Sequence, residues 1–90
     1  MDLLTWLEEW YRCKCDGAWE HSHGVRLDTI DNPGWRVEVD IGPEIPDVVH
    51  EEQRTDLDWI SCRVEQGRSS GADGPANLAE ILVVLQGWLD

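Results

Sequence analysis

The segment Trp35–Ile41 alternates strictly between apolar and polar side chains, and this alternation restricts the fold more than any other feature of the chain. Its two sets fall on opposite sides of an extended backbone: Trp35, Val37, Val39 and Ile41 against Arg36, Glu38 and Asp40. Period-two alternation is typical of a strand with one buried and one solvated face. A β-rich run and a turn signal (Val25–Ile30, then Asp31-Asn32-Pro33-Gly34) precede it, so residues 25–41 are predicted to form a hairpin with Trp35 buried.

Further strands are predicted on both sides of this hairpin. A short strand over Ala18–His21 comes before it, and an edge strand over Val48–Glu51 follows the proline-containing breaks. Residues 57–65 form a stronger strand, whose buried side is predicted to carry Ile60, Cys62 and Val64. The Gly- and Ser-rich stretch from Gly67 to Pro75 is predicted as a loop with room for a short strand over residues 68–72.

Helical periodicity marks both ends of the chain. The first helix has one apolar stripe, follows a possible cap at Asp2 and stops at Asp16-Gly17; its stripe is Leu3, Trp6, Leu7, Trp10 and Tyr11. The last helix follows Asn77-Leu78-Ala79-Glu80, which has the form of a capping box, and carries Leu78, Ile81, Leu82, Leu85, Trp88 and Leu89 at helical spacing. Trp6, Trp10 and Trp88 are therefore expected in the core.

The order of helix, strands and helix predicts an α+β fold in which the two terminal helices cover one face of an antiparallel sheet of about four to five strands. Ninety residues leave no room for a second core, so residues 1–90 are predicted to be a single domain. The second face of the sheet would stay open to solvent or to a partner.

The net charge excludes several classes of function. The chain has 19 acidic and 7 basic residues, a formal charge of −12, which argues against nucleic-acid binding and against anionic membranes. We expect neither a signal peptide nor a membrane-spanning run, because the first residues contain no basic region and no long apolar stretch, and the odd number of cysteines predicts reduced thiols in the cytoplasm. We expect no disulfide and favour a monomer, with the oligomeric state left open.

Acidic residues are concentrated in residues 38–58, which carry eight carboxylates and one arginine, a net charge of −7. Such a stretch is either a solvated strand face with its loop or a surface complementary to a basic partner. Trp59 and Trp19 are the tryptophans expected to be available as interface anchors, although each could equally lie flat on its own sheet. The candidate binding residues are Arg36, Glu38, Asp40, Glu44, Asp47, Glu51, Glu52, Asp56, Asp58, Trp59 and Trp19.

Metal binding and catalysis receive little support. Cys13, Cys15, His21 and His23 are zinc-competent, but both spacings are shorter than those of zinc sites. A thiolate pair of Cys62 with His50, or of Cys15 with His21, is conceivable, yet Cys62 lies between apolar neighbours and is predicted to be an inert thiol. We therefore expect no metal, no cofactor and no catalytic residue.

Several tryptophan-containing blocks resemble the immunity protein 53 family of bacteria. They begin with Trp6-Leu7, Trp10-Tyr11 and Cys15-Asp16-Gly17, continue through Trp19-Glu20-His21, Asp31-Asn32-Pro33-Gly34-Trp35 and Val37-Glu38-Val39-Asp40, and resume at Asp58-Trp59-Ile60, Cys62 and Val64-Glu65. They end with Gly74-Pro75, Asn77-Leu78 and Glu80-Ile81-Leu82. The blocks follow the family's order over nearly the whole chain, and residues 42–56 diverge most.

The resemblance implies a small non-enzymatic protein that binds and neutralises a cognate toxin domain of a polymorphic toxin system. It does not identify the chemistry of the toxin, and the acidic stretch suggests a basic, nuclease-type surface. Two alternatives remain: a generic acidic interaction or regulatory module without a toxin, and a small thiol- or metal-dependent enzyme.

Overall fold

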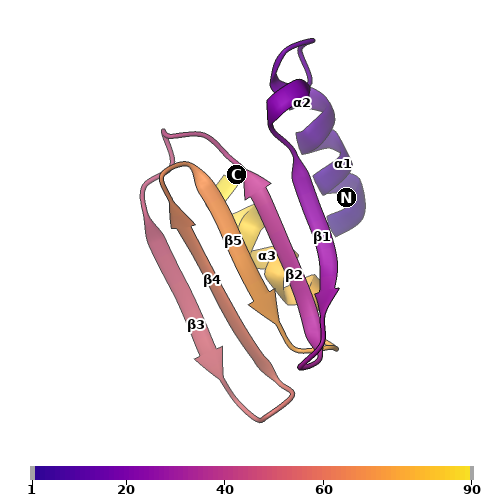
Figure 1. Cartoon of the computed structure of the whole chain (residues 1–90), viewed down its shortest axis with the longest axis vertical. Helices are drawn as coiled ribbons and strands as arrows, with labels where there is room; N and C mark the ends of the chain where they lie inside the picture. The colour runs from indigo at the N-terminus through magenta and orange to yellow at the C-terminus, as the bar shows by residue number, and fades with distance from the viewer. Residues whose placement is uncertain (1, 90) are drawn as a thin grey trace.

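A five-stranded antiparallel sheet lies against two helices in a computed structural model of the chain, which describes residues 2–89 (Figure 1). The elements are α1 (Leu3–Lys14), α2 (Trp19–Ser22), β1 (Val25–Ile30), β2 (Gly34–Asp40), β3 (Val48–Gln53), β4 (Trp59–Glu65), β5 (Arg68–Asp73) and α3 (Leu78–Leu89). The strands are ordered β1-β2-β5-β4-β3 across the sheet. The predicted α+β class and the two terminal helices are confirmed.

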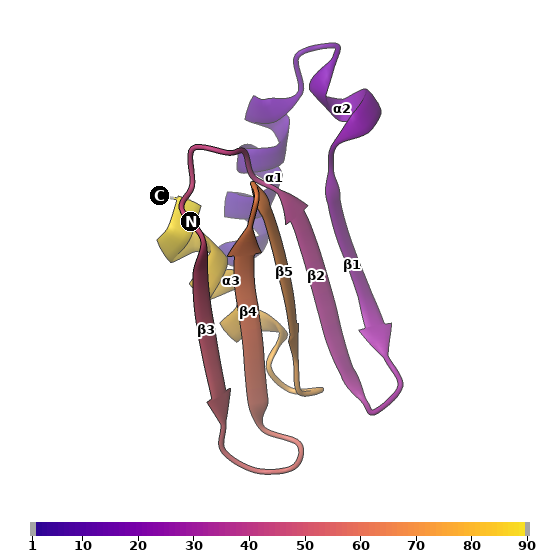
Figure 2. The same ribbon diagram turned by 60° about the vertical axis from the view of Figure 1, so that its left-hand side comes forward.

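The core lies between the sheet and the two long helices, which both lie on one side of the strands (Figure 2). Its buried residues come from the inward positions of β2 and β4, from the segment after β2 and from both helices: Trp6, Val37, Val39, Ile41, Ile60, Cys62, Val64, Ile81, Leu82 and Leu85. The predicted buried side of β4 is confirmed. Trp10 and Trp88 are half-buried and pack against this core.

The central strand of the sheet is β5, which the sequence indicated only as a short strand inside a loop. It pairs with β2 on one side and with β4 on the other. Its sequence, Arg-Ser-Ser-Gly-Ala-Asp, contains no β-branched or aromatic residue, so its strand propensity is low. Small side chains are needed here because a Cβ at Gly71 would lie 3.0 Å from both Cys62 Sγ and Ile81 Cδ1. The strand therefore lets α3 pack closely on the sheet.

The predicted strand over Ala18–His21 is wrong, because this segment forms the helical turn α2. The Asp16 carboxylate accepts hydrogen bonds from the backbone N–H groups of Ala18 and Trp19, both at 2.9 Å. The Glu20 carboxylate in turn accepts from the N–H groups of Asp16 and Gly17. These local bonds satisfy the N–H groups at the start of a turn, which a strand would leave for a neighbour.

The capping box predicted before α3 does not form, although α3 does begin directly after Asn77. The Asn77 side-chain amide donates to Asp58 Oδ1 and to the Trp59 carbonyl, and the Asn77 N–H donates to the Gly74 carbonyl. The Glu80 carboxylate binds Arg54 instead of reaching back to Asn77. The Asn77 and Glu80 side chains therefore bind residues far away in the sequence instead of the backbone N–H groups at the start of α3.

Trp35 is half-buried, not buried as the alternation predicted. It is the second residue of β2, next to the turn that follows β1, and its indole N–H donates to the Pro75 carbonyl at 3.0 Å. The ring thus lies at the end of the sheet beside the loop that leads into α3, where the core no longer covers it fully.

Candidate functional site

The face of the sheet that the helices leave uncovered carries mainly charged and small side chains. Cross-strand partners share a face, so the strand register groups these residues into rows. One row runs Arg26, Glu38, Ser70, Arg63, Val49, and the next runs Asp28, Arg36, Ala72, Ser61, Glu51. We call this surface the open face.

Most charges of the open face are paired within it. Arg36 binds the Asp28 carboxylate through two bonds of 3.1 and 2.7 Å. This pairing lowers the pKa of Asp28 because Arg36 stabilises the ionised carboxylate. Arg63 binds Glu65 at 3.1 Å. The strands present four of the seven basic residues here beside five carboxylates, so the open face is nearly neutral and most of the net charge lies elsewhere.

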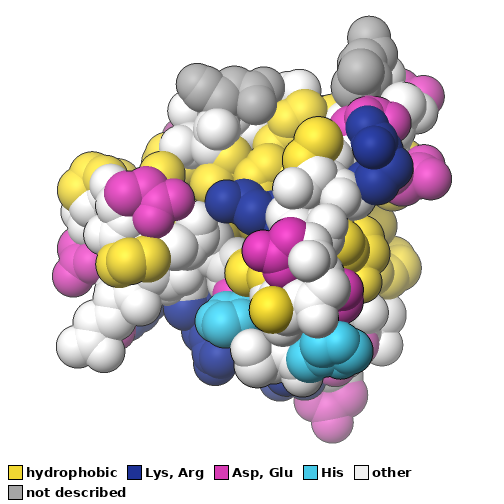
Figure 3. Space-filling view, turned by 90° about the horizontal axis from the view of Figure 1, so that it is seen from above, with side chains coloured by type: hydrophobic (Ala, Val, Ile, Leu, Met, Phe, Trp, Pro, Cys, Tyr) yellow, Lys and Arg dark blue, Asp and Glu magenta, His cyan; other side chains and the backbone are white. Residues whose placement is uncertain are grey.

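A cleft of about 580 Å³ opens at the end of the sheet where β2 and β4 finish and β5 begins. Figure 1 places this end at the top, beside α2, and Figure 3 looks onto it, with histidine, acidic and hydrophobic side chains close together. We call it the end cleft; its lining comes from three separate segments: Trp19, Ser22 and His23, then Asp40, Gly42 and Pro43, then Glu65, Gln66, Gly67 and Arg68.

Asp40 connects two of the segments around the end cleft through hydrogen bonds. Its carboxylate accepts from Arg68 Nε at 3.1 Å and from the Gly24 N–H at 2.9 Å, and only 12% of its side chain is exposed. Asp47 lies beside the same turn, since its Oδ1 accepts from the Gln66 N–H at 3.2 Å. The carboxylate of Glu44 lies against Gly42, whose φ of 106° favours glycine. Negative charge therefore predominates around this cleft.

Aromatic rings form one wall of the end cleft. Trp19 stacks on the His23 ring with centroids 5.8 Å apart, and its edges contact Trp10 and Tyr11 of α1. The half-buried Trp19 is thus fixed by α1 while one part of it faces the cleft. Four candidate binding residues predicted from the sequence, namely Trp19, Asp40, Glu44 and Asp47, meet at this end.

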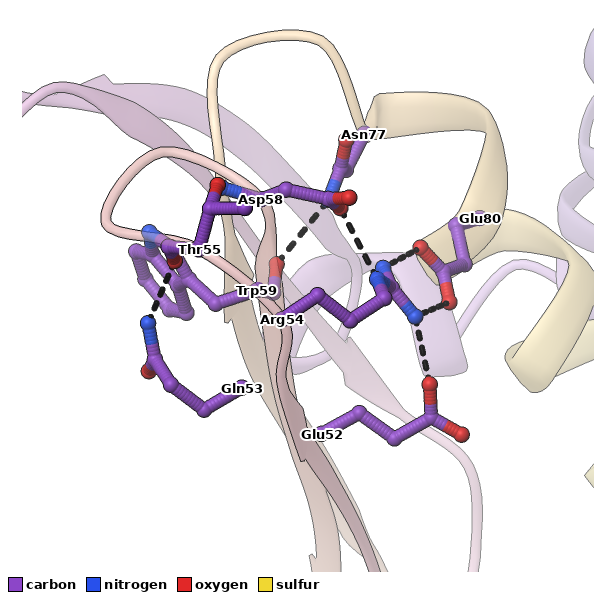
Figure 4. A network of polar contacts seen from close by, with 8 residues as sticks. All are labelled: Glu52, Gln53, Arg54, Thr55, Asp58, Trp59, Asn77 and Glu80. Atoms are coloured by element: carbon purple, nitrogen blue, oxygen red, sulfur yellow. Dashed lines mark hydrogen bonds and ion pairs between the residues drawn. The ribbon is translucent and has the colours of Figure 1, made fainter.

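A second group of candidates lies at the opposite end of the sheet, around Arg54 (Figure 4). The Arg54 guanidinium contacts the carboxylates of Glu52, Asp58 and Glu80. Asn77 and then Arg54 lower the pKa of Asp58, because both donate to its ionised carboxylate. Glu52 and Asp58 are consequently engaged in joining the β3–β4 loop to α3, whereas Asp56 lies exposed in that loop.

The remaining candidates lie on or beside the open face. Trp59 points to this face, as the sequence predicted, and is half-buried at the start of β4 opposite Gln53. Glu38 is also half-buried, and Glu51 lies near Arg63 at 4.0 Å. The eleven candidates therefore form no single patch: four surround the end cleft, three lie on the open face with Trp59, and three lie in or beside the Arg54 loop.

Sequence reasoning missed His23, Glu65 and Arg68, which line the end cleft. The sequence suggests His23 only as a metal ligand. Glu65 and Arg68 flank the turn before β5, a strand that the sequence indicates only as a short segment within a loop. Arg68 approaches Asp40 because β5 pairs with β2, a pairing for which the sequence carries no local signal.

Cys62 is not arranged as a reactive thiol. Cys62 is directly opposite His50 in the β3–β4 ladder, but burial, with the nearby carboxylates of Asp73 and Glu80, raises the pKa of its thiol to about 12. A nucleophilic cysteine needs a lowered pKa. Within residues 2–89, no group of three or more His, Cys, Asp or Glu side chains is arranged to hold a metal ion. None of the described helices is long and apolar enough to cross a membrane.

Residues 4–90 match the model of the family described as Immunity protein 53. No curated protein and no solved structure matches the chain.

Proposed function

The chain belongs to the immunity protein 53 family, and from this membership we propose that it binds and neutralises a cognate bacterial polymorphic toxin in the cytoplasm of the producing cell. Binding would be stoichiometric and without catalysis. The observation that carries this proposal is the family match over nearly the whole chain.

Occlusion of the toxin's active site or substrate surface is the mechanism that we propose. Five strands at a spacing of about 4.8 Å, with six or seven residues each rising about 3.3 Å, give the open face a width and length of about 24 and 20 Å. The resulting flat area of about 480 Å² is somewhat more than half of the roughly 800 Å² that each partner contributes to a standard interface, and the end cleft adds to it.

The charge distribution suggests that the open face and the end cleft would contribute differently to binding. The open face is nearly neutral because its basic and acidic residues almost balance and most of them are paired, so it offers shape and fixed hydrogen-bonding groups. Glu65 lines the end cleft and the exposed Glu44 and Asp47 lie beside it, next to an aromatic wall, and these carboxylates would meet a basic region of the toxin, such as a nuclease groove. Attraction of this kind mainly accelerates encounter and selects the partner.

Co-expression tests the proposal. Cells that express the toxin domain encoded beside this gene should survive when the chain is co-expressed, and the two purified proteins should form a one-to-one complex. Failure to rescue and to bind, with both proteins folded and expressed, would contradict the proposed function.

Two double variants that remove the same amount of charge test the role of the end cleft separately. The double variant Glu44→Gln/Asp47→Asn should slow association with the toxin several-fold at low ionic strength and less at high ionic strength. Glu8→Gln/Asp31→Asn removes the same charge at exposed positions away from the cleft and serves as the control. Equal effects of the two variants would contradict a localised role and leave only a general effect of charge.

A further inference from the structure

Strand β1 is an uncovered edge of the sheet. Its four central residues are exposed, and Figure 2 shows no helix or loop along its outer side. It contains neither a proline nor a bulge, and its charged side chains, Arg26 and Asp28, lie on the open face. Two usual devices that keep a strand edge from pairing, a proline and a bulge, are thus absent from this strand, and its two charged residues are of opposite sign.

The backbone groups at this edge can be assigned from the ladder. The Asp40 N–H donates to the Gly24 carbonyl at 3.1 Å, so Gly24 is in a hydrogen-bonded pair with β2. Hydrogen-bonding direction alternates along an antiparallel strand. Arg26 and Asp28 therefore bond to β2, and the N–H and C=O groups of Val25, Leu27 and Thr29 point outward.

The side chains of these three outward-bonding residues lie on the helix-covered side, where α1 leaves the edge partly open. Leu27 is 41% exposed, and Tyr11 of α1 is 42% exposed. A groove of about 330 Å³ between α1 and β1 is lined by Leu7, Glu8, Tyr11, Gly24 and Val25. Unpaired backbone groups and exposed apolar side chains thus occur together at one edge.

We propose that β1 pairs with β1 of a second copy of this chain about a two-fold axis at Leu27, giving a continuous ten-stranded sheet with the helices of both copies on one side. A two-fold axis requires a self-complementary surface. In this register Leu27 faces Leu27, Val25 faces Thr29 at the mouth of the groove, and Arg26 faces Asp28 of the other copy twice. Arg26 makes no ion pair among the residues that the structure describes, and in the dimer it would share the Asp28 carboxylate that Arg36 of the other copy already binds.

The charges favour this central register over the two neighbouring ones. Shifting the pairing by one step toward either end places Arg26 against Arg26 or Asp28 against Asp28 at the axis, and like charges directly opposite are destabilising. In the central register the ionic residues form non-hydrogen-bonded pairs, in which side chains approach most closely. The other edge strand, β3, contains Glu51 and Glu52 but no Lys or Arg, so no register of β3 with itself pairs opposite charges.

The dimer replaces the monomer that composition favoured. Each copy carries a charge of −12, but charges further apart than about 8 Å are largely screened at physiological ionic strength, and the edge itself carries one positive and one negative residue. Pairing of one six-residue edge is a small interface, so the dissociation constant is expected in about the micromolar to millimolar range.

Two single charge reversals test the pairing by sedimentation at physiological ionic strength. Arg26→Asp places Asp against Asp in its homodimer, and Asp28→Arg places Arg against Arg, so each variant alone should dimerise at least about tenfold more weakly than the wild type. An equimolar mixture of the two should recover dimerisation, because both cross-contacts in the mixed dimer are then opposite in charge. Circular dichroism spectra and unfolding midpoints establish that each variant is folded.

Glu51→Arg on β3 is the matched control and should leave the dissociation constant unchanged. Amide exchange gives an independent readout: the Leu27 and Thr29 amides should become protected as protein concentration rises, while those of Arg26 and Asp28 stay protected throughout. A wild-type chain that remains monomeric at about 1 mM overturns the proposal. So does a dimer that survives both reversals, or one that the mixture fails to restore.

Discussion

Arg54 grips the carboxylate of Glu80 through two hydrogen bonds, Nη2 to Oε1 at 2.6 Å and Nη1 to Oε2 at 3.1 Å. This pair connects the loop between β3 and β4 to the first turn of α3, residues that are 26 positions apart in the chain. The same guanidinium donates to Asp58 at 2.9 Å and contacts Glu52. These hydrogen bonds to carboxylates raise the pKa of Arg54, so it stays charged at any pH at which the protein is folded.

Replacing Arg54 by Ala should lower the thermal unfolding midpoint, because Glu52, Asp58 and Glu80 then repel one another with no cation between them. Arg12→Ala is the control, since Arg12 binds Glu9 in an exposed pair on α1 and its loss should change little. Thermal denaturation of both variants followed by circular dichroism measures the difference. A drop no larger for Arg54→Ala than for Arg12→Ala would show that the cluster does not stabilise the fold.

The buried Asp73 should give the free energy of unfolding an unusual dependence on pH. Its side chain is completely buried, and neither carboxylate oxygen has a hydrogen-bond partner among the described residues. Burial, and then the negative charge of Glu80, raises the pKa of Asp73 from 3.8 to about 6. Because the folded state binds this proton more tightly than the unfolded chain, this group adds stability as pH falls from about 7 toward 4, on the order of 3 kcal/mol.

The variant Asp73→Asn should lose this contribution. Denaturant unfolding between pH 4 and 7 should show wild-type stability rising on acidification, and the variant should show a flatter profile over the same interval. Below about pH 4 both proteins should lose stability, because Asp2, Asp16, Asp28 and Asp58 have lowered pKa values and become protonated there. If the two proteins show the same dependence of stability on pH, another group causes it and the prediction for Asp73 is wrong.

Gly71 and Gly87 form a matched pair for testing how α3 packs on the sheet. Gly71→Ala puts a methyl group 3.0 Å from Cys62 Sγ and from Ile81 Cδ1, which should cost about 1–3 kcal/mol of unfolding free energy. Gly87→Ala adds the same methyl on the exposed side of α3, where nothing lies within 4 Å. It should be neutral or stabilising by up to about 1 kcal/mol, since alanine favours helix. Chemical denaturation distinguishes the two, and equal effects would contradict the close approach.

The three thiols should differ in reactivity. Cys13 is exposed, whereas Cys62 is buried and its pKa is raised to about 12. Alkylation at pH 8 followed by peptide mass spectrometry should modify Cys13 while Cys62 stays intact until denaturant is added, because only the thiolate reacts. Rapid labelling of native Cys62 would show that the core opens around β4.

How far sequence patterns extend is clearest from single elements. Residues 35–41 and residues 57–65 were assigned to strands with the correct buried side, because alternation depends only on the nearest neighbours along the chain. Residues 18–21 were assigned wrongly, since Asp16 and Glu20 supply hydrogen bonds that favour a helical turn. The candidate binding residues were identified individually, but their division between the end cleft, the open face and the Arg54 loop was not foreseen.

The sequence by itself determined the two terminal helices, the buried sides of β2 and β4, the excess of acidic residues and the family. Only the tertiary structure decided that the weakly patterned β5 occupies the centre of the sheet, that Arg68 neutralises Asp40, and that Asp73 is sealed beneath α3. Residues 40 and 68 meet because β2 and β5 pair in one register, and such pairings join residues far apart in the chain. Local periodicity fixes which way a side chain points, whereas its neighbours, and therefore its charge state and availability to a partner, depend on non-local packing.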